Sequence, residues 1–382
     1  MTQYSMCVFS WNTSSLPLSE TLDSVKAEYN RSGFQIPFVG MRLTTWQCSS
    51  YILPDFYYEL EDKLQKLNCD IIVIGFQEDR YPGSYFHSHL LPEKLSGIGY
   101  ELVKRTKMMG VGVTSCKGVF NGEVFERGVR VSIYAKKKLL PSILWEENDI
   151  RKNIGNEGQE EYICTSSVTR SKGATLSYLK LPGICPINII CCHLPFDAES
   201  LITTKMHQNY MLRQNDLNNN NICFNNIYEN LVLYKNNGND NVIYFGDFNY
   251  RLNDPRPASE VASEFLDHPN EEFCLEMYNL YDELREQMQR GNIYSFDEGI
   301  ENQGPSFLPT AKMAKNRRKT DIVWNTGKYD QRTPSWCDRI LYKSGLKNDI
   351  ECIYYDRFDS GEAMKKSDHA GVIAVFNIST SI

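Results

Sequence analysis

The sequence predicts an α/β protein in which two packed β-sheets carry helices on their outer faces. Strand-like runs recur from one end of the 382-residue chain to the other, only a few stretches have helical periodicity, and no Pro-rich or Ser-rich linker separates them. The strand-like runs are Met6–Trp11, Ile71–Phe76, Val129–Ala135, Ala174–Leu181, Ile187–Cys192, Val242–Phe245 and Val372–Phe376. One large domain over residues 1–382 is therefore expected rather than two independent units.

The apolar pattern of the runs indicates how each strand is covered. Ile71–Phe76 and Ile187–Cys192 are apolar without alternation, which is typical of strands buried on both faces. The run Ala174–Leu181 alternates between apolar and polar residues, which indicates a strand with one wetter face.

A helix is predicted over residues 54–67, where Phe56, Leu60, Leu64 and Leu67 form one apolar stripe. Residues 208–235 contain a longer helical candidate that four asparagines, 218–221, interrupt. Because asparagine is a poor helix former, this segment is expected to be a loop or a weak helix. The asparagine run is interpreted as a composition bias without function.

Composition and termini restrict the class of protein. A formal net charge of -7 argues against a general nucleic-acid coat but leaves room for a local basic pocket. The 12 cysteines lack the spacing of a disulfide scaffold or a zinc site, so reduced thiols and a cytoplasmic location are expected. We expect no signal peptide, no membrane-spanning helix and no prenyl anchor.

Polar residues follow several of the apolar runs. They are Asn12, Gln77, Glu78, His193, Asp247 and Asn249, whereas Asp368 and His369 lie just before the last run, Val372–Phe376. A single polar residue at a strand end is more often a turn former or a helix cap, and the pair Asp247 and Asn249 could form an Asx turn. Their recurrence is equally consistent with one shared site on a rigid frame.

If Glu78, Asp247 and Asp368 converge, their charges must be neutralised, because an unpaired buried charge costs several kcal/mol. Oxygen ligands without a cysteine cluster favour a hard divalent cation such as Mg²⁺. The chain has only 6 histidines, which argues against a His-rich zinc or iron site.

The stretch RTPSWCDRILY, residues 332–342, places an aspartate at the start of a strand. Asp338 could pair with His369 and fix the tautomer of its imidazole. A structural salt link between Asp338 and Arg339 is an equally good interpretation of the sequence.

The motifs SWN, GFQE, RSKGA, CHL, GDFNYRL, PSWCDRIL and SDH, taken together and in this order, resemble the inositol polyphosphate 5-phosphatase catalytic domain. The resemblance extends from Trp11 to about Phe376. It implies the deoxyribonuclease-I-like four-layer sandwich, in which two packed mixed β-sheets are flanked by helices. It also implies Mg²⁺-dependent hydrolysis of the 5-phosphate of phosphoinositides or soluble inositol polyphosphates by in-line attack of water.

The resemblance further assigns roles to individual residues. It implies a metal site with three members, Glu78, Asn12 and Asp368. It implies that Asp247 orients or deprotonates the attacking water, that Asn249 and His193 donate to the phosphate, and that His369, oriented by Asp338, faces it. Lys172 is expected at the rim of the substrate pocket. The positive groups expected near the inositol ring are Lys312, Arg332 and Arg251, of which Arg251 could instead brace its own loop.

The chain departs from the family pattern at two positions associated with the 4-phosphate. Ala311 replaces a tyrosine and Asp330 replaces a lysine, so recognition of that phosphate is weakened. The basic stretch 315–319 could compensate or could be a solvated loop. Gly371 replaces a proline in the last motif, which concerns only the turn.

The expected partners are inositol phosphates or phosphoinositide headgroups, with no nucleic acid and a monomeric chain. Lys136–Lys138 could contact anionic lipid, at about 1 kcal/mol per lysine near the surface. Two other interpretations stay open: a nuclease or sphingomyelinase of the same superfamily, and a catalytically inactive phosphoinositide-binding module.

Overall fold

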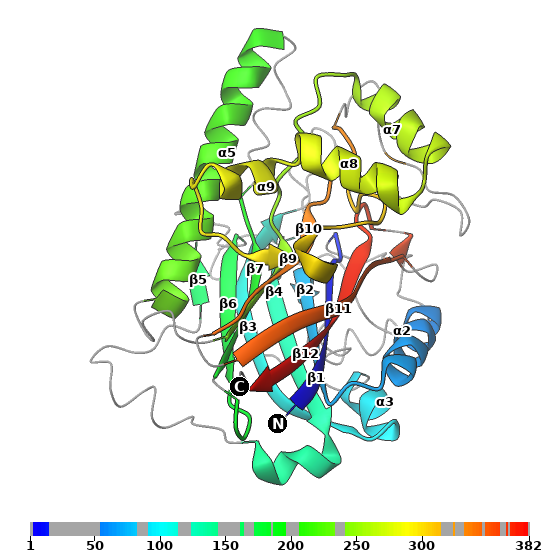
Figure 1. Cartoon of the computed structure of the whole chain (residues 1–382), viewed down its shortest axis with the longest axis vertical. Coiled ribbons are helices and arrows are strands. Elements are labelled where there is room, and N and C mark those ends of the chain that lie inside the picture. Colours follow the sequence, from blue (N-terminus) through cyan, green and yellow to red (C-terminus); the bar gives the residue numbers. More distant parts are fainter. Residues whose placement is uncertain are drawn as a thin grey trace.

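Two six-stranded mixed sheets packed face to face form the centre of the protein (Figure 1). The structure is a computed structural model, which describes residues 3–14, 54–81, 91–113, 124–143, 161–163, 172–184, 186–195, 206–233, 241–314, 324, 332–345, 348–359, 364–365 and 367–380. Helices cover the outer faces of both sheets, so the predicted four-layer sandwich is confirmed.

The first sheet has the strand order β11-β12-β1-β2-β4-β3. Its strands are β1 Gln3–Asn12, β2 Ile71–Tyr81, β3 Tyr100–Val113, β4 Val124–Lys136, β11 Asn348–Phe358 and β12 Gly371–Thr380. β1 and β2 are parallel, whereas the other neighbouring strands are antiparallel.

The second sheet has the order β5-β6-β7-β8-β10-β9. Its strands are β5 Glu161–Ile163, β6 Gly173–Leu179, β7 Ile187–His193, β8 Asn241–Asp247, β9 Asp297–Glu298 and β10 Asp338–Lys343. Here β7 and β8 form the parallel pair. In each sheet a parallel pair therefore brings two carboxyl-terminal strand ends to the same edge.

The helices lie outside the sheets and at one end of the sandwich. The α-helices are α2 Pro54–Leu67, α3 Leu91–Gly97, α5 Met206–Tyr228, α7 Ala258–Asp267, α8 Glu271–Tyr281 and α9 Glu283–Gln289. The other short helices are the 3₁₀-helices η2 Lys137–Ser142 and η5 Ile300–Asn302 and the π-helix η4 Glu229–Leu233. α2 and α3 pack on the first sheet and α5 on the second, whereas α7 and α8 lie at the upper end in Figure 1.

Strand alternation explains how one sheet serves two cores. In β1, Met6 and Val8 point into the core between the sheets, whereas Phe9 and Trp11 point towards α2 and α3. The sheets approach closely at Gly75 in β2, where an added Cβ would lie 2.3 Å from the ring of Phe245.

All seven strand-like runs fall in strands, although β6 ends at Leu179 rather than Leu181. β3 and β11 escaped prediction because they are edge strands of the first sheet, where exposed positions admit charged residues. The predicted helix over 54–67 is α2, in which Leu60 and Leu64 are buried.

Of the two expectations for residues 208–235, the helix is confirmed over α5 and the loop is wrong at the asparagines 218–221, through which α5 runs without a break. Packing of Phe224 and Ile227 against the second sheet outweighs the weak helix propensity of asparagine. The expectation of reduced thiols holds for seven of the described cysteines and is wrong for Cys223, which is disulfide-bonded.

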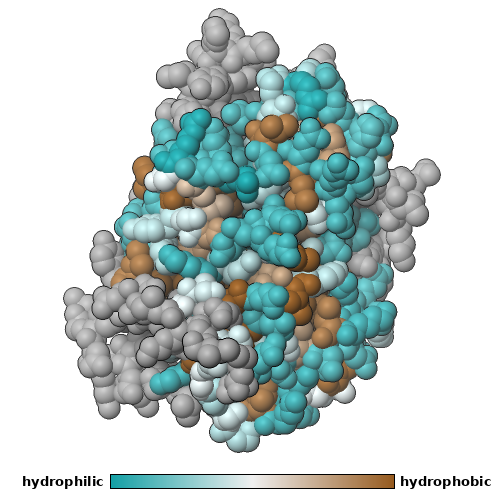
Figure 2. Space-filling view, viewed as in Figure 1, coloured by the Kyte–Doolittle hydropathy of each residue, from teal (hydrophilic) through white to brown (hydrophobic). Residues whose placement is uncertain are grey.

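The surface turned to the viewer in Figure 2 is largely hydrophilic, and its apolar side chains lie in small separate groups. Large exposed apolar residues of the described chain include Tyr58, Ile222, Leu266 and Leu280. Scattered apolar side chains of this kind are normal on a folded domain. Of the helices in the described residues, none has the length and apolar character needed to cross a bilayer.

Candidate active site

Four strand ends from the two sheets meet at one edge of the sandwich. The register of the first sheet places Asn12 of β1 opposite Gln77 of β2. In the second sheet, His193 of β7 lies opposite Asp247 of β8. A hydrogen bond of 2.8 Å from Asn12 Nδ2 to Asp247 Oδ2 joins the two sheets at this point. The predicted convergence of these strand ends is therefore present.

Asp247 lies at the centre of this cluster and is 1% exposed. His193 Nε2 lies 3.4 Å and His369 Nε2 lies 4.0 Å from Asp247 Oδ2. Burial raises the pKa of Asp247, but the hydrogen bond from His193 and the charge of His369 outweigh it and hold the pKa well below its usual value. Asp247 is therefore a buried carboxylate surrounded by donors.

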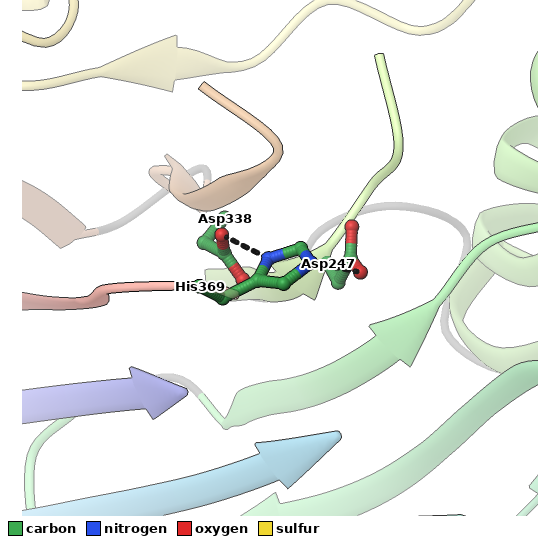
Figure 3. Close-up of side chains that lie close together, drawn as sticks. All are labelled: Asp247, Asp338 and His369. Carbon is green, nitrogen blue, oxygen red and sulfur yellow. Dashed lines mark hydrogen bonds and ion pairs between the residues drawn. The ribbon is translucent and has the colours of Figure 1, made fainter. Parts of the chain in front are cut away.

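His369 lies between two carboxylates, as Figure 3 shows. Its Nδ1 hydrogen-bonds Asp338 Oδ2 at 2.8 Å, and its Nε2 faces Asp247. Burial lowers the pKa of His369, but the charges of Asp338 and Asp247 outweigh burial and raise the pKa above its usual value. The predicted pairing of Asp338 with His369 is thus present.

The alternative salt link between Asp338 and Arg339 is absent. The fully buried Arg339 donates from Nε to Glu298 Oε1 at 2.6 Å and from Nη1 to Asp282 Oδ2 at 2.9 Å. Because successive residues of a strand point to opposite faces, Asp338 and Arg339 contact different surroundings.

Lys172 and His193 form the third part of the cluster. Lys172 Nζ contacts His193 Nε2, so Lys172 lies against the centre and not only at the pocket rim as expected. Burial, together with the charge of Lys172, lowers the pKa of His193 to about 4. His193 is therefore neutral at pH 7.

Asn249 has a fixed backbone and a fixed side chain. Its φ of 56° lies in the left-handed region, which asparagine tolerates better than most residues. Its backbone N donates to Asp247 Oδ1 at 3.0 Å, and its Nδ2 donates to Leu194 O at 3.0 Å. Arg251 Nη2 donates to Asn249 Oδ1 at 3.1 Å, so Arg251 braces this loop.

Glu78 lies in an irregular part of β2, where the register shifts between Phe76 and Asp79. Its φ of 53° is a sparsely populated conformation for a non-glycine residue, and such conformations gather at functional sites. Thr13 Oγ1 donates to Glu78 O at 3.1 Å, and Arg130 Nε donates to Asp79 Oδ2 at 2.5 Å. The bulge that presents Glu78 is thus held on both sides.

The oxygen donors at this edge suit a hard divalent cation. Glu78 offers a half-buried carboxylate, and its charge acts on His193. Asn12 Oδ1 accepts one hydrogen bond, from Ser14 N at 3.0 Å, and an amide oxygen has a second lone pair. Carboxylate and amide oxygens are ligands that Mg²⁺ and Ca²⁺ prefer.

Asp247, Asp338 and His369 also have ligand atoms within 4.8 Å of one another. In this trio the imidazole is hydrogen-bonded to one carboxylate and faces the other. The arrangement suits an acid–base pair beside Asp247, because the neighbouring carboxylates raise the pKa of His369 and favour its protonated form.

Asp368 contacts two side chains of the protein, and its place in the metal site stays a prediction. Both of its oxygens are engaged, one by Lys312 Nζ and the other by Ser14 Oγ. The backbone keeps this arrangement in place, since Met313 N donates to Asp368 O at 2.7 Å. Lys312 therefore lies beside the site, as expected, where it forms an ion pair with Asp368.

The structure describes some, but not all, of the positions at which the sequence departs from the family pattern. Ala311 is fully buried and bridges to Ser335 and His369, so a small side chain fits its place. Asp330 and the basic stretch 315–319 lie outside the described residues. Arg332 is half-buried.

The lysines proposed to contact lipid lie at the other end of the sandwich. Lys136 of β4 lies opposite Tyr100 of β3, and its Nζ is 3.6 Å from Asp70 Oδ1, just before β2 begins. Glu78, in contrast, lies near the end of β2. Lys138 Nζ is 3.9 Å from the same Asp70. Lys136–Lys138 therefore lie at the end of the sheet opposite the site.

The sequence did not predict the residues that hold the site residues in place without belonging to the site. Ser14, Thr13 and the buried pair Arg130–Asp79 act through contacts with distant segments. Residue spacing carries no signal for such contacts, apart from the position of Thr13 and Ser14 directly after Asn12.

Comparisons with known proteins agree with this geometry. A family model described as endonuclease/exonuclease/phosphatase family 2 matches residues 10–375. The phosphatidylinositol polyphosphate 5-phosphatase type IV of Rattus norvegicus is 37% identical over 139 residues, which are 36% of this chain and 19% of that protein. The chain thus matches about a fifth of the length of that relative.

Two solved structures have a similar fold. The inositol polyphosphate 5-phosphatase domain of SPsynaptojanin, in complex with inositol (1,4)-bisphosphate and a calcium ion, has a TM-score of 0.58 at 18% identity and covers 100% of this chain and 86% of that chain. A ferrous NO complex of a nitrophorin from Cimex has a TM-score of 0.53 at 17% identity and covers 99% of both chains. Because the family model covers nearly the whole sequence, the chain belongs to the endonuclease/exonuclease/phosphatase family.

Proposed function

We propose that the protein is a metal-dependent phosphoric monoester hydrolase that removes the 5-phosphate from inositol polyphosphates or phosphoinositides. The observation that carries the proposal is the buried carboxylate of Asp247 with Asn12, His193 and His369 around it. Keeping a charge of this kind out of water costs several kcal/mol, so it needs specific partners. The names of the relatives and of the similar phosphatase domain support the choice of substrate.

The depressed pKa of Asp247 keeps it ionised at neutral pH, so it can orient a water molecule and accept its proton. Asn249 donates one Nδ2 hydrogen to Leu194 O, which leaves the other hydrogen to donate to a phosphate oxygen. His369, whose pKa is raised by Asp338, can offset negative charge on the phosphoryl oxygens in its protonated form as the reaction proceeds.

Glu78 and Asn12 would hold the divalent cation, and Mg²⁺ is the ion that oxygen donors and a phosphate substrate favour. When bound, the ion supplies charge neutralisation at the phosphate and activation of water. Lys172 and Lys312 add positive charge at the same edge, although Lys312 must exchange its contact with Asp368 for one with substrate.

Lipid and soluble substrates share the same headgroup chemistry. A lipid substrate must approach the edge that contains Asp247, and Lys136–Lys138 lie at the opposite end of the sheet. Membrane contact through those lysines would turn the site away from the bilayer. We therefore place any membrane contact on the surface around the site itself.

The proposal is tested by phosphate release from a panel of inositol phosphates and short-chain phosphoinositides, with Mg²⁺, with Ca²⁺ and with a chelator. We expect Mg²⁺-dependent release from substrates that carry a 5-phosphate, and loss of release in Asp247→Asn. The exposed Asp267 of α7 gives the matched control, Asp267→Asn. Binding of inositol phosphates without any release, or faster turnover of an abasic duplex or of sphingomyelin, would overturn the proposal.

A further inference from the structure

The asparagine run of α5 has a buried half and an exposed half. Asn218 and Asn219 are exposed, whereas Asn220 and Asn221 are 1% and 8% exposed. Buried amides are costly unless they are hydrogen-bonded. The contacts of the buried pair therefore show what this part of the helix does.

Asn221 joins the helix to the loop that follows β8. The hydroxyl of Tyr250 donates to Asn221 Oδ1 at 2.8 Å. Asn221 Nδ2 donates to Gln287 Oε1 at 2.8 Å, which orients the amide so that its oxygen faces the tyrosine. Asn220 Nδ2 makes a longer contact of 3.4 Å with Phe248 O. Both buried asparagines thus contact the residues on either side of Asn249.

The same loop is held from the opposite side by the segment before β10. Phe248 N donates to Cys337 O at 2.8 Å, and Cys337 Sγ donates to Tyr250 O at 3.4 Å. Asn249 lies between these two attachments with a φ of 56°. A non-glycine residue keeps such a conformation only where its surroundings hold it.

We propose that Asn221, acting through Tyr250, is a positioning residue that holds Asn249 in its working orientation. This inference rests on the proposed function, in which Asn249 donates to the phosphate. Asn221 touches neither the carboxylate of Asp247 nor the imidazoles, so its effect reaches the site through the loop backbone. A small displacement of a donor in an active site can cost up to about 100-fold in rate.

The asparagine run supplies its own control. Asn221→Ala and Asn219→Ala are the same substitution in the same helix, two residues apart, and both replace asparagine by a better helix former. We expect Asn221→Ala to lower kcat about tenfold or more with little change in KM, since the donor is misplaced and not removed. Asn219→Ala should retain wild-type kcat.

Double variants separate positioning from general destabilisation. If Asn221 acts through Asn249, then Asn221→Ala lowers kcat in the wild-type background and has no further effect in an Asn249→Ala background. A merely structural role gives the same fold-change in both backgrounds, and that outcome would overturn the inference. Should Asn221→Ala fail to fold, Tyr250→Phe removes only the hydroxyl and tests the same contact.

A spectroscopic measurement tests the positioning without turnover. In protein labelled with ¹⁵N-asparagine, the side-chain amide signal of Asn249 is identified by its loss in Asn249→Ala. It should shift in Asn221→Ala and Tyr250→Phe and stay in place in Asn219→Ala. An unchanged signal in all three variants rules the inference out. A shifted signal in a protein without phosphatase activity would reject the proposed function and keep the positioning role.

Discussion

Replacing Asp338 by asparagine isolates the charge that acts on His369. The side chain keeps its shape, and its amide oxygen still accepts the hydrogen bond from His369 Nδ1. Only the negative charge is lost. Because that charge raises the pKa of His369, the substitution lowers the pKa, and His369 becomes neutral at a lower pH than in the wild type.

The size of the effect follows from the geometry. Coulomb's law with an effective dielectric constant of about 20 gives roughly 6 kcal/mol for unit charges separated by the 2.8 Å between His369 Nδ1 and Asp338 Oδ2. The hydrogen bond that survives in the amide, and solvation of the altered site, reduce this figure. A loss of about 3–5 kcal/mol of transition-state stabilisation corresponds to a decrease of roughly 10²–10⁴-fold in kcat.

The assay is the pH dependence of phosphate release by the wild type and by Asp338→Asn. The raised pKa of His369 means that its charge, and the stability it contributes, is complete below the unfolded-state pKa and is lost as pH rises through the folded-state pKa. The alkaline limb of the profile should therefore move to lower pH in the variant. A folded variant with kcat within twofold of the wild type and an unmoved alkaline limb would refute the reasoning.

Three further outcomes are expected. Arg339→Met should lower the free energy of unfolding by about 3–5 kcal/mol, measured in urea, because Asp282 and Glu298 then remain buried without their cation; a change under 1 kcal/mol would contradict this. The pKa of His193 is about 4 in the folded protein and 6.5 ordinarily, so the unfolded state binds more protons between these two pH values. The free energy of unfolding should therefore fall by about 3 kcal/mol as pH decreases from 6.5 to 4. This pH dependence of the free energy of unfolding should be absent in His193→Gln. Glu78→Gln should raise the Mg²⁺ concentration for half-maximal activity at least about tenfold at unchanged Tm, and an equal Mg²⁺ requirement would remove Glu78 from the metal site.

The polar residues at the strand ends could be predicted from the sequence, whereas the residues that they contact could not. β2 and β7 are uninterrupted apolar runs, so their ends and the polar residues after them could be identified without a fold. The partner of Asp338 lies 31 residues away in the chain, and spacing says nothing about such a contact. Strand alternation explains why Arg339 is not that partner, since neighbours in a strand point to opposite faces.

The asparagine run shows why local propensity fails at a site. Each asparagine of α5 weakens the isolated helix by a few tenths of a kcal/mol, which led to the expectation of a loop or a weak helix. A buried contact such as the 2.8 Å hydrogen bond from Tyr250 to Asn221 contributes about as much or more in the folded protein. Which member of the run is buried depends on the rotation of the helix against the second sheet, and that is a property of the tertiary structure.

The fold by itself does not decide what this protein does, because similar architectures belong to a phosphatase domain and to a nitrophorin. The side chains at the strand ends carry the distinction. A sandwich that served only as a scaffold would be at least as stable with apolar residues in place of Asp247, Asp338 and His369. This chain instead keeps two carboxylates and an imidazole in contact, each less than 4% exposed, at the one edge where both parallel strand pairs end. Buried charges held in this way cost stability, and the chemistry of a phosphate ester is the use that explains all of them together.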